Sequence, residues 1–343
     1  MGRKRSKSHH LPPHMAQKGQ AYYYVTNSTP RKWIPLGNDL HQARLKWAEL
    51  EREPIDTQDK TFAVIAERYR REVLKQKAQR TQRDYREALE RLVIVFGHVP
   101  IDAIAPQDVR EYMNRRGDKA KVRANREKAM LSTLYNHARE WGYTTAANPC
   151  AGVKGFKEAG RDRYVEDAEY LTVWQAASAP IQDAMDIAYL TGQRPADVLK
   201  MRLADIKDGA IEVQQNKTKK KLRILLDDGG IRTELGKVID RIKARDRKVA
   251  SLFLIATPAG KALNQWTLRT RFDDARNDAV KVATAAGDTE LAARIREFQF
   301  RDIRPKAASE MDLGHASKLL GHTEHEITEK VYRRVGETVK PTR

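Results

Sequence analysis

The sequence has little cysteine and no long apolar run. Cys150 is the single cysteine among 343 residues, which excludes an intramolecular disulfide framework and fits a reducing compartment with an inert thiol. No run approaches the ~20 apolar residues of a membrane span, and the basic N-terminus lacks the apolar core of a secretory signal. We therefore expect a soluble, cytoplasmic protein that contacts no membrane.

Acidic residues are scarce relative to basic ones. The chain holds 65 Lys and Arg against 46 Asp and Glu, which gives a formal net charge of +19. An excess of this size favours a polyanionic partner, and nucleic acid leads over anionic lipid or a basic surface without a partner. Because 343 residues exceed the usual size of a single core, we expect two or three domains.

The first 38 residues contain no Asp or Glu. Aromatic and apolar runs at 21–25 and 32–36 predict a small sheet, and residues 40–50 predict a helix. Basic side chains interleaved with aromatics suit contact with DNA, while residues 1–18 fit a solvated basic tail equally well. We expect a basic DNA-binding arm domain at residues 1–57. Its candidate DNA-binding residues are Arg3, Lys4, Arg5 and Lys7.

Apolar residues recur at helical spacing between residues 61 and 141. The pattern predicts four helices, which open near Thr61, Thr81, Pro106 and Asn125. An all-helical domain is therefore expected at residues 58–150. For a basic cluster on its polar faces we favour phosphate contact over a merely solvated surface; the cluster comprises Lys119, Lys121, Arg123, Arg126 and Lys128.

The remainder of the chain predicts a mixed unit. Residues 151–163 have no periodicity and read as a linker, and 164–343 should form an α+β domain, mostly helical with a β-hairpin sheet. Helical patterns cover 167–178, 181–190, 231–248 and 264–285, strand patterns cover 210–214 and 222–226, residues 252–255 form a short buried run, and 284–289 read as a loop. The predicted fold class is therefore multidomain and mainly α.

Cleavage of a phosphodiester without a metal sets clear demands on side chains. Arginine can bind two non-bridging oxygens and stays charged, and a lysine or histidine can protonate the leaving oxygen. A tyrosine nucleophile, with an ordinary pKa near ~10, must lose its proton or lie beside cations. In a chain with 65 basic residues and 12 tyrosines, only the order and context of such residues carry information.

Five separated motifs resemble the tyrosine recombinase (phage integrase) family in order and approximate spacing, over essentially the whole chain. They are Thr191-Gly192-Gln193-Arg194, a hairpin with Lys217 at its tip, Arg301-x-x-Arg304, Leu320-Gly321-His322 and Tyr332. The resemblance implies that Arg194 and Arg304 clamp the scissile phosphate, and that His322 forms a hydrogen bond with it. Lys217 would protonate the leaving 5′ oxygen, and Tyr332 would form a 3′-phosphotyrosyl link, with no metal and no other cofactor.

Two positions in these motifs leave alternatives open. Arg301 stands where the family usually has histidine, and arginine cannot accept the proton that Tyr332 must lose. His322 or water would then take that proton, or the chemistry is slow or absent. Lys217 competes with its neighbours up to Lys221 as the proton donor, and Lys219 is expected to bind DNA. Asp197, three residues after Arg194, is expected to orient that arginine.

By the same resemblance the chain is expected to be a site-specific recombinase that integrates or excises a phage or mobile element. It would work as a homotetramer on double-stranded DNA in the nucleoid of a bacterial host, with the arm domain on arm-type sites and the rest on core-type sites. A host DNA-bending protein and an excisionase are expected partners, and residues 333–343 would dock on a neighbouring protomer. The alternatives are a type IB topoisomerase-like enzyme and a catalytically impaired DNA-binding regulator.

Overall fold

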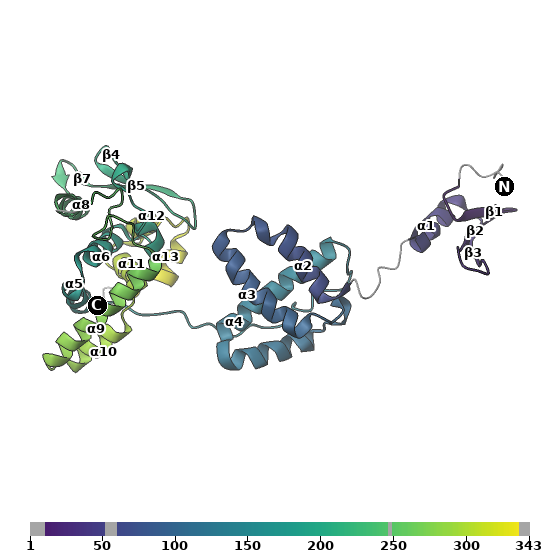
Figure 1. Ribbon diagram of the computed structural model, residues 1–343, viewed down its shortest axis with the longest axis horizontal. Helices are drawn as coiled ribbons and strands as arrows, with labels where there is room; N and C mark the ends of the chain where they lie inside the picture. The colour runs from purple at the N-terminus through teal and green to yellow at the C-terminus, as the bar shows by residue number, and fades with distance from the viewer. Residues whose placement is uncertain (1–10, 52–59, 246–248, 336–343) are drawn as a thin grey trace, which may run out of the picture. The chain divides into compact units, whose positions relative to one another are not determined.

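The chain divides into two compact units, residues 1–159 and 160–343. The computed structural model describes residues 11–51, 60–245 and 249–335. Most of these residues lie in helices, and small antiparallel sheets account for the strands (Figure 1). The fold is mainly α with small β-sheets, as predicted. Within the described ranges, every helix is too short or too polar to cross a membrane.

A small antiparallel sheet lies near the start of the described chain. Its strands pair in the order β1-β2-β3, and Leu36 of β3 packs with Ala43 of the following helix in a small core. The elements are β1 (Met15–Lys18), β2 (Ala21–Val25), β3 (Trp33–Gly37) and α1 (Leu40–Glu51). The predicted sheet and helix are confirmed. Strand β1 was not predicted, because Ala16-Gln17-Lys18 contains no side chain that favours strands. The candidate residues Arg3, Lys4, Arg5 and Lys7 lie outside the described residues.

Residues 60–159 form a helical bundle with its own apolar core. The helices are α2 (Phe62–Glu72), α3 (Gln79–Phe96) and α4 (Pro106–Glu140), with single 3-10 turns at Leu74–Gln76 and Ile101–Ala103. The first three helices are confirmed. The predicted fourth helix is the second half of α4, which is separated from the first half by a break at Ala120, where φ is −160° and ψ is 73°. It begins a few residues before the predicted start at Asn125, directly after this break.

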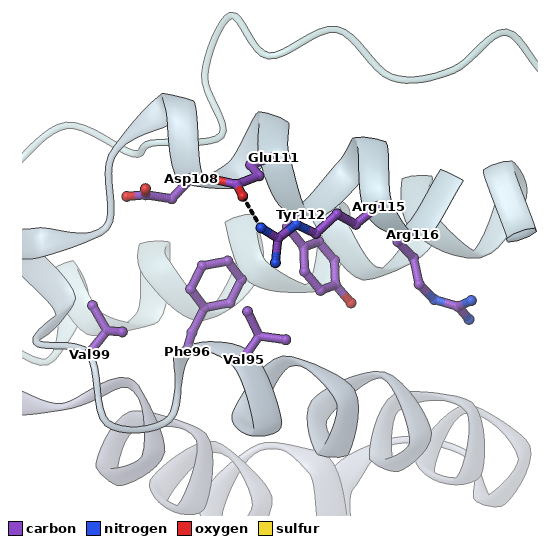
Figure 2. A pocket seen from close by; sticks show the side chains of 8 residues that line it. All are labelled: Val95, Phe96, Val99, Asp108, Glu111, Tyr112, Arg115 and Arg116. Atoms are coloured by element: carbon purple, nitrogen blue, oxygen red, sulfur yellow. Dashed lines mark hydrogen bonds and ion pairs between the residues drawn. The ribbon is translucent and has the colours of Figure 1, made fainter. Parts of the chain in front are cut away.

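A buried carboxylate accounts for the bend in α4. Tyr112 Oη donates to Glu127 Oε2 at 2.7 Å, although residues this far apart in a straight helix would lie roughly 22 Å from each other. Arg116 binds the same carboxylate through Nε at 2.8 Å and Nη2 at 3.1 Å. Tyr112 and Arg116 also line a cavity of about 480 Å³ beside Phe96 (Figure 2). The two halves of α4 are therefore held together by one ion-pair cluster.

The second unit is mostly helical and contains a three-stranded sheet of order β4-β5-β6 and a two-stranded β7-β8 pair. Its core includes Ile187, Ile211, Phe272 and Phe298. The helices are α5 (Asp167–Ala176), α6 (Ala179–Thr191), α7 (Pro195–Val198), α8 (Glu234–Ala244), α9 (Gln265–Ala285), α10 (Thr289–Glu297), α11 (Ile303–Ser309), α12 (Leu313–Leu320) and α13 (His325–Tyr332). The strands are β4 (Ile206–Lys207), β5 (Ala210–Gln214), β6 (Lys221–Leu225), β7 (Asp227–Asp228) and β8 (Ile231–Arg232).

The predicted hairpin and the predicted helices at 167–178, 181–190 and 264–285 are confirmed within one or two residues at most ends. The helix predicted at 231–248 starts later, because residues 231–232 pair with β7 and the Thr233 side chain caps α8 by accepting from Gly236 N. Helix α10 was not predicted. The run 252–255 is only partly buried, since Leu252 is exposed while Leu254 and Ile255 are buried.

Candidate active site

Two glycine turns bring backbone oxygens to one buried guanidinium. Gly192 ends α6 with φ 61°, and Gly321 ends α12 with φ 71°, a conformation that glycine adopts without strain. A Cβ at Gly192 would lie 3.0 Å from Leu320 Cδ2. The two turns therefore pack against each other, and the Thr191-Gly192 and Leu320-Gly321 motifs build one site together.

Arg304 joins these turns. Its Nη1 donates to Gly192 O at 2.6 Å, and its Nη2 donates to Leu320 O at 2.9 Å and to His322 Nε2 at 3.1 Å. The side chain is almost fully buried, and burial lowers the pKa of Arg304 to about 10, so it stays charged at neutral pH. Among the described residues its enclosed Nε has no hydrogen-bond partner, which leaves one donor for a ligand.

Tyr332 lies on this guanidinium at the end of α13. The guanidinium carbon of Arg304 is 4.8 Å from the centroid of the tyrosine ring, and the His322 ring centroid is 4.9 Å from it. Burial acts to raise the pKa of Tyr332, but the charges of Arg304 and Arg194, with hydrogen bonds from both, outweigh burial and lower it. The cations therefore make the phenol more acidic than a free tyrosine and ease its conversion to the phenolate, the form that can attack phosphorus.

His322 is held on both ring nitrogens. Nε2 lies 3.1 Å from Arg304 Nη2, and Nδ1 lies 2.8 Å from Thr328 Oγ1. Burial, followed by the charges of Arg304, Arg194 and Lys220, lowers the pKa of His322 to about 4. The imidazole is therefore neutral at neutral pH in the absence of a bound anion.

Two buried glutamines connect the motifs, and sequence reasoning missed both. Gln215 Nε2 donates to Gln193 Oε1 and to Leu320 O, both at 2.8 Å. Gln215 Oε1 accepts from Thr218 Oγ1 at 2.5 Å and from Arg194 Nη1 at 3.5 Å. Ile211, Val213 and Gln215 alternate with exposed residues and lie on the buried side of the strand. A glutamine at a position where the alternation predicts an apolar residue could have indicated a buried polar contact.

The expected pairing of Asp197 with Arg194 is corrected by the structure. Asp197 Oδ1 accepts from Asn216 N at 2.7 Å and lies 3.5 Å from Lys200 Nζ, while Oδ2 has no hydrogen-bond partner among the described residues. Arg194 precedes α7 in an extended conformation, with φ −69° and ψ 150°, so the three-residue helical spacing does not apply. Asp197 instead holds the start of the loop that joins β5 to β6.

The candidate lysines of that hairpin have different surroundings. Lys217 and Lys219 are exposed at the tip. Lys220 reaches the site, where its Nζ donates to His322 O at 3.4 Å. The structure therefore brings Lys220 to the guanidinium cluster and leaves Lys217 exposed at the hairpin tip.

A basic cavity of about 500 Å³ opens beside Tyr332. Arg301 is exposed on its wall, so the structure brings this predicted residue to the site but not into the buried cluster. The cavity carries a concentrated positive charge that suits a phosphate backbone. Its basic lining comprises Arg161, Arg163, Arg194, Arg301, Arg304, Lys330 and Arg334.

Two lining arginines come from the predicted linker and were missed. Arg161 binds Asp302 in a two-point pair, with Nε to Oδ1 and Nη2 to Oδ2 both at 2.7 Å. Arg163 contacts Glu169 and donates to Arg294 O at 2.5 Å. The last part of residues 151–163 is therefore bound to the second unit, directly beside the segment that carries Arg304.

The basic cluster of the helical bundle lies on α4. Lys119, Lys121, Arg123 and Arg126 are exposed, and Arg123 lies 3.6 Å from Glu87. Lys128 is the exception, because its half-buried ammonium donates to Val153 O at 2.6 Å. Lys128 thus anchors the chain after α4 to this helix, and its phosphate contact stays a prediction.

Known proteins are similar to this chain in sequence and in fold. A sequence model of the phage integrase family matches residues 163–338. The integrase of Escherichia phage lambda is 26% identical over 92% of this chain and 94% of its own length, and that of Enterobacteria phage 434 is 27% identical over the same shares.

Solved structures extend the likeness over the whole fold. A lambda integrase dimer bound to a COC′ core site superposes with a TM-score of 0.67 at 21% identity, covering 99% of both chains. A lambda integrase tetramer bound to a Holliday junction gives the same values. The Tn1549 transposon integrase in complex with circular intermediate DNA has a TM-score of 0.61 at 15% identity, over 80% of this chain and 96% of that one.

Proposed function

Because this chain belongs to the phage integrase family, we propose that Tyr332 attacks a DNA phosphodiester held by Arg194 and Arg304 and becomes linked to the 3′ phosphate. The chain is thus a site-specific tyrosine recombinase, an enzyme that cuts and rejoins DNA. One observation carries the assignment of the nucleophile. Tyr332 stacks on the buried Arg304 guanidinium, where two cations lower the pKa of its phenol.

The arrangement suits reversible strand exchange. Attack by Tyr332 forms the Oη–P bond and breaks the P–O5′ bond, so the new phosphotyrosyl link retains the energy of the phosphodiester. A second 5′ hydroxyl can attack that link and reseal the DNA without ATP. The arginines stabilise charge on the non-bridging oxygens during both steps, and the exposed Arg301 adds positive charge at the cavity wall.

The leaving 5′ oxygen requires a proton, which we assign to Lys217 at the hairpin tip. Lys220 is the alternative, favoured by its contact with His322 O at 3.4 Å. Replacing the 5′ bridging oxygen by sulfur removes the need for an acid, because a thiolate leaves unprotonated. Lys217→Ala should lose cleavage of ordinary DNA and recover it on the sulfur-bridged strand, while Lys220→Ala should show no such recovery. The reverse pattern would assign the acid to Lys220.

The chain acts on double-stranded DNA as a homotetramer, in keeping with the lambda integrase dimer bound to a core site and the lambda integrase tetramer bound to a Holliday junction. We propose residues 58–150 and 164–343 as core-binding and catalytic domains joined by 151–163, and residues 1–57 as an arm-type DNA-binding domain. Lys119, Lys121, Arg123 and Arg126, with Lys219 on the hairpin, are the proposed phosphate contacts. A host DNA-bending protein, an excisionase and a location in the bacterial nucleoid are also proposals.

A covalent adduct tests the enzyme proposal. Duplexes that react with the native protein are selected from a random-sequence pool by capture of the covalent adduct. The selected duplex is then nicked beside the scissile phosphate, so that the short fragment with the new 5′ hydroxyl diffuses away after cleavage and the adduct cannot reseal. The native protein should give an adduct on a denaturing gel, and Tyr332→Phe should give none. An empty selection with the native protein would favour a DNA-binding regulator.

Joining distinguishes a recombinase from a topoisomerase-like enzyme. Two differently labelled duplexes that carry the selected site should exchange strands in a reaction that depends steeply on protein concentration, because synapsis needs four protomers. Relaxation of supercoiled DNA without exchange between duplexes would favour the topoisomerase-like alternative.

A further inference from the structure

The hydrogen bonds of His322 define which of its nitrogens carries a proton. Arg304 Nη2 is 3.1 Å from His322 Nε2, and a guanidinium nitrogen can only donate, so Nε2 accepts. A neutral imidazole then has its proton on Nδ1, which donates to Thr328 Oγ1 at 2.8 Å. In this arrangement Nε2 presents a lone pair to the site.

Thr328 is itself fixed. It is fully buried in α13, one helical turn before Tyr332, and Ser317 Oγ of α12 donates to its Oγ1 at 2.8 Å. After Ser317, helix α12 continues into the turn that carries His322. The backbone N–H of His322 donates to Ser317 O at 2.9 Å. The pair therefore ties the helix before His322 to the helix that ends at Tyr332.

We propose that Thr328 is a positioning residue that keeps the proton of neutral His322 on Nδ1, so that Nε2 takes the proton of Tyr332 during cleavage. This inference rests on the proposed function, since it assigns the base for the same nucleophile. It also accounts for Arg301, because an arginine at that position is tolerable when another residue accepts the proton.

The step balances in atoms and charge. A scissile phosphate draws the Arg304 donors to its oxygens and frees His322 Nε2. The Tyr332 O–H bond breaks as the Oη–P bond forms, and the proton moves to Nε2. The resulting imidazolium donates from Nε2 to a non-bridging oxygen, while the P–O5′ bond breaks and O5′ takes a proton from the hairpin lysine. Resealing runs the same transfers backwards.

The surroundings of His322 support a neutral starting state. The groups that face it are Arg304 of α11, Arg194 before α7, Lys220 of the hairpin and the Tyr332 phenol of α13. After burial, the three cations lower the pKa of His322 to about 4. A bound phosphate offsets these cations and raises the basicity of Nε2 when the proton must be accepted.

Thr328→Val removes the acceptor at Nδ1 while it keeps the shape of the side chain. Nuclear magnetic resonance of the full chain labelled with ¹⁵N-histidine reports the tautomer of His322, whose signal is identified by its loss in His322→Asn. The native protein should show the proton on Nδ1, and Thr328→Val should shift His322 toward the Nε2-protonated form. A native His322 with its proton on Nε2 would overturn the proposal.

Kinetics on the nicked, selected duplex give a second readout. Adduct formation at pH 7 should slow about tenfold or more in Thr328→Val, since one neutral hydrogen bond is worth about a factor of ten. Thr328→Ser should restore the rate to within about threefold, and the sulfur-bridged strand that recovers the lysine variant should not recover Thr328→Val. Thr323→Val, at an exposed threonine nearby, is the matched control and should react like the native protein.

Different results would overturn the role of Thr328 and the recombinase function. A native adduct together with an undiminished rate in Thr328→Val would overturn the role of Thr328 and leave the recombinase assignment intact. Absence of any native adduct would remove the proposed function itself, and the tautomer measurement would still stand as a structural result. Should Thr328→Val unfold, shown by its melting curve, Ser317→Ala tests the same relay and should slow adduct formation with retention of the native fold.

Discussion

Replacing Gln215 by leucine should uncouple the three motif stretches while it leaves the core filled. The amide of Gln215 is completely buried and holds Gln193, Leu320 and Arg194 together. Leucine leaves Gln193 Oε1 without its donor, which costs about 1–3 kcal/mol for one buried unpaired acceptor. Leu320 O keeps the bond from Arg304 Nη2 at 2.9 Å, so the orphaned Gln193 oxygen dominates the loss.

The expected destabilisation is thus about 2 kcal/mol, or a fall of about 4–8 °C in the melting transition of a unit of this size. Adduct formation measured well below that transition should fall further, because Arg194 also loses a positioning contact. Gln214→Leu is the matched control, since Gln214 is the exposed neighbour on the opposite face of β5. Equal melting temperatures and equal adduct rates for the two variants would refute the role given to Gln215.

Three further outcomes are expected. Glu127→Ala leaves the buried Tyr112 hydroxyl and the partly buried Arg116 guanidinium without their acceptor, and it should cost about 1–3 kcal/mol in calorimetry. Glu87→Ala, at an exposed ion pair, should change the unfolding temperature little, and comparable losses would contradict the buried cluster. Gly321 has φ 71°, and a Cβ at this position would lie 2.7 Å from the buried amide of Gln215, whereas Gly229 has φ 56° and open space around it. Gly321→Ala should therefore lower the free energy of unfolding more, and slow cleavage more, than the control Gly229→Ala. The pKa of His322 is lowered to about 4 in the folded protein, so the stability that the neutral imidazole contributes should be complete above pH ~6.5 and decline as the pH falls toward 4. His322→Gln should flatten this decline in curves of unfolding free energy against pH. A variant curve identical to the native one would contradict the expected titration of His322.

The sequence was most informative where chemistry imposes order. Arg194, Arg304, His322 and Tyr332 were named from their motifs, and the fold brings these four together. Charged and aromatic residues at fixed spacing around Thr-Gly and Leu-Gly can be recognised in a single sequence. Each of these turns needs a glycine in the left-handed conformation at the end of a helix, so the sequence marks it directly.

Contacts between distant side chains could not be predicted in the same way. Asp197 binds the hairpin and not Arg194, because one extended residue before α7 changes where the side chains point. Arg161 reaches Asp302 across 141 positions of sequence, and no periodicity marks such a pair. Lys128 looks like any surface lysine until the carbonyl of Val153 is known to lie beside it. The bend at Ala120 likewise follows from the buried Glu127 cluster and not from the residue at the bend.

The identity of the nucleophile is the central claim, and mapping the covalent link tests it most directly. The adduct trapped on the nicked, selected duplex is digested with protease and nuclease and analysed by mass spectrometry. We predict a single nucleotide joined through its 3′ phosphate to the peptide that contains Tyr332. A nucleotide on any other residue, or an adduct that persists in Tyr332→Phe, would contradict the account.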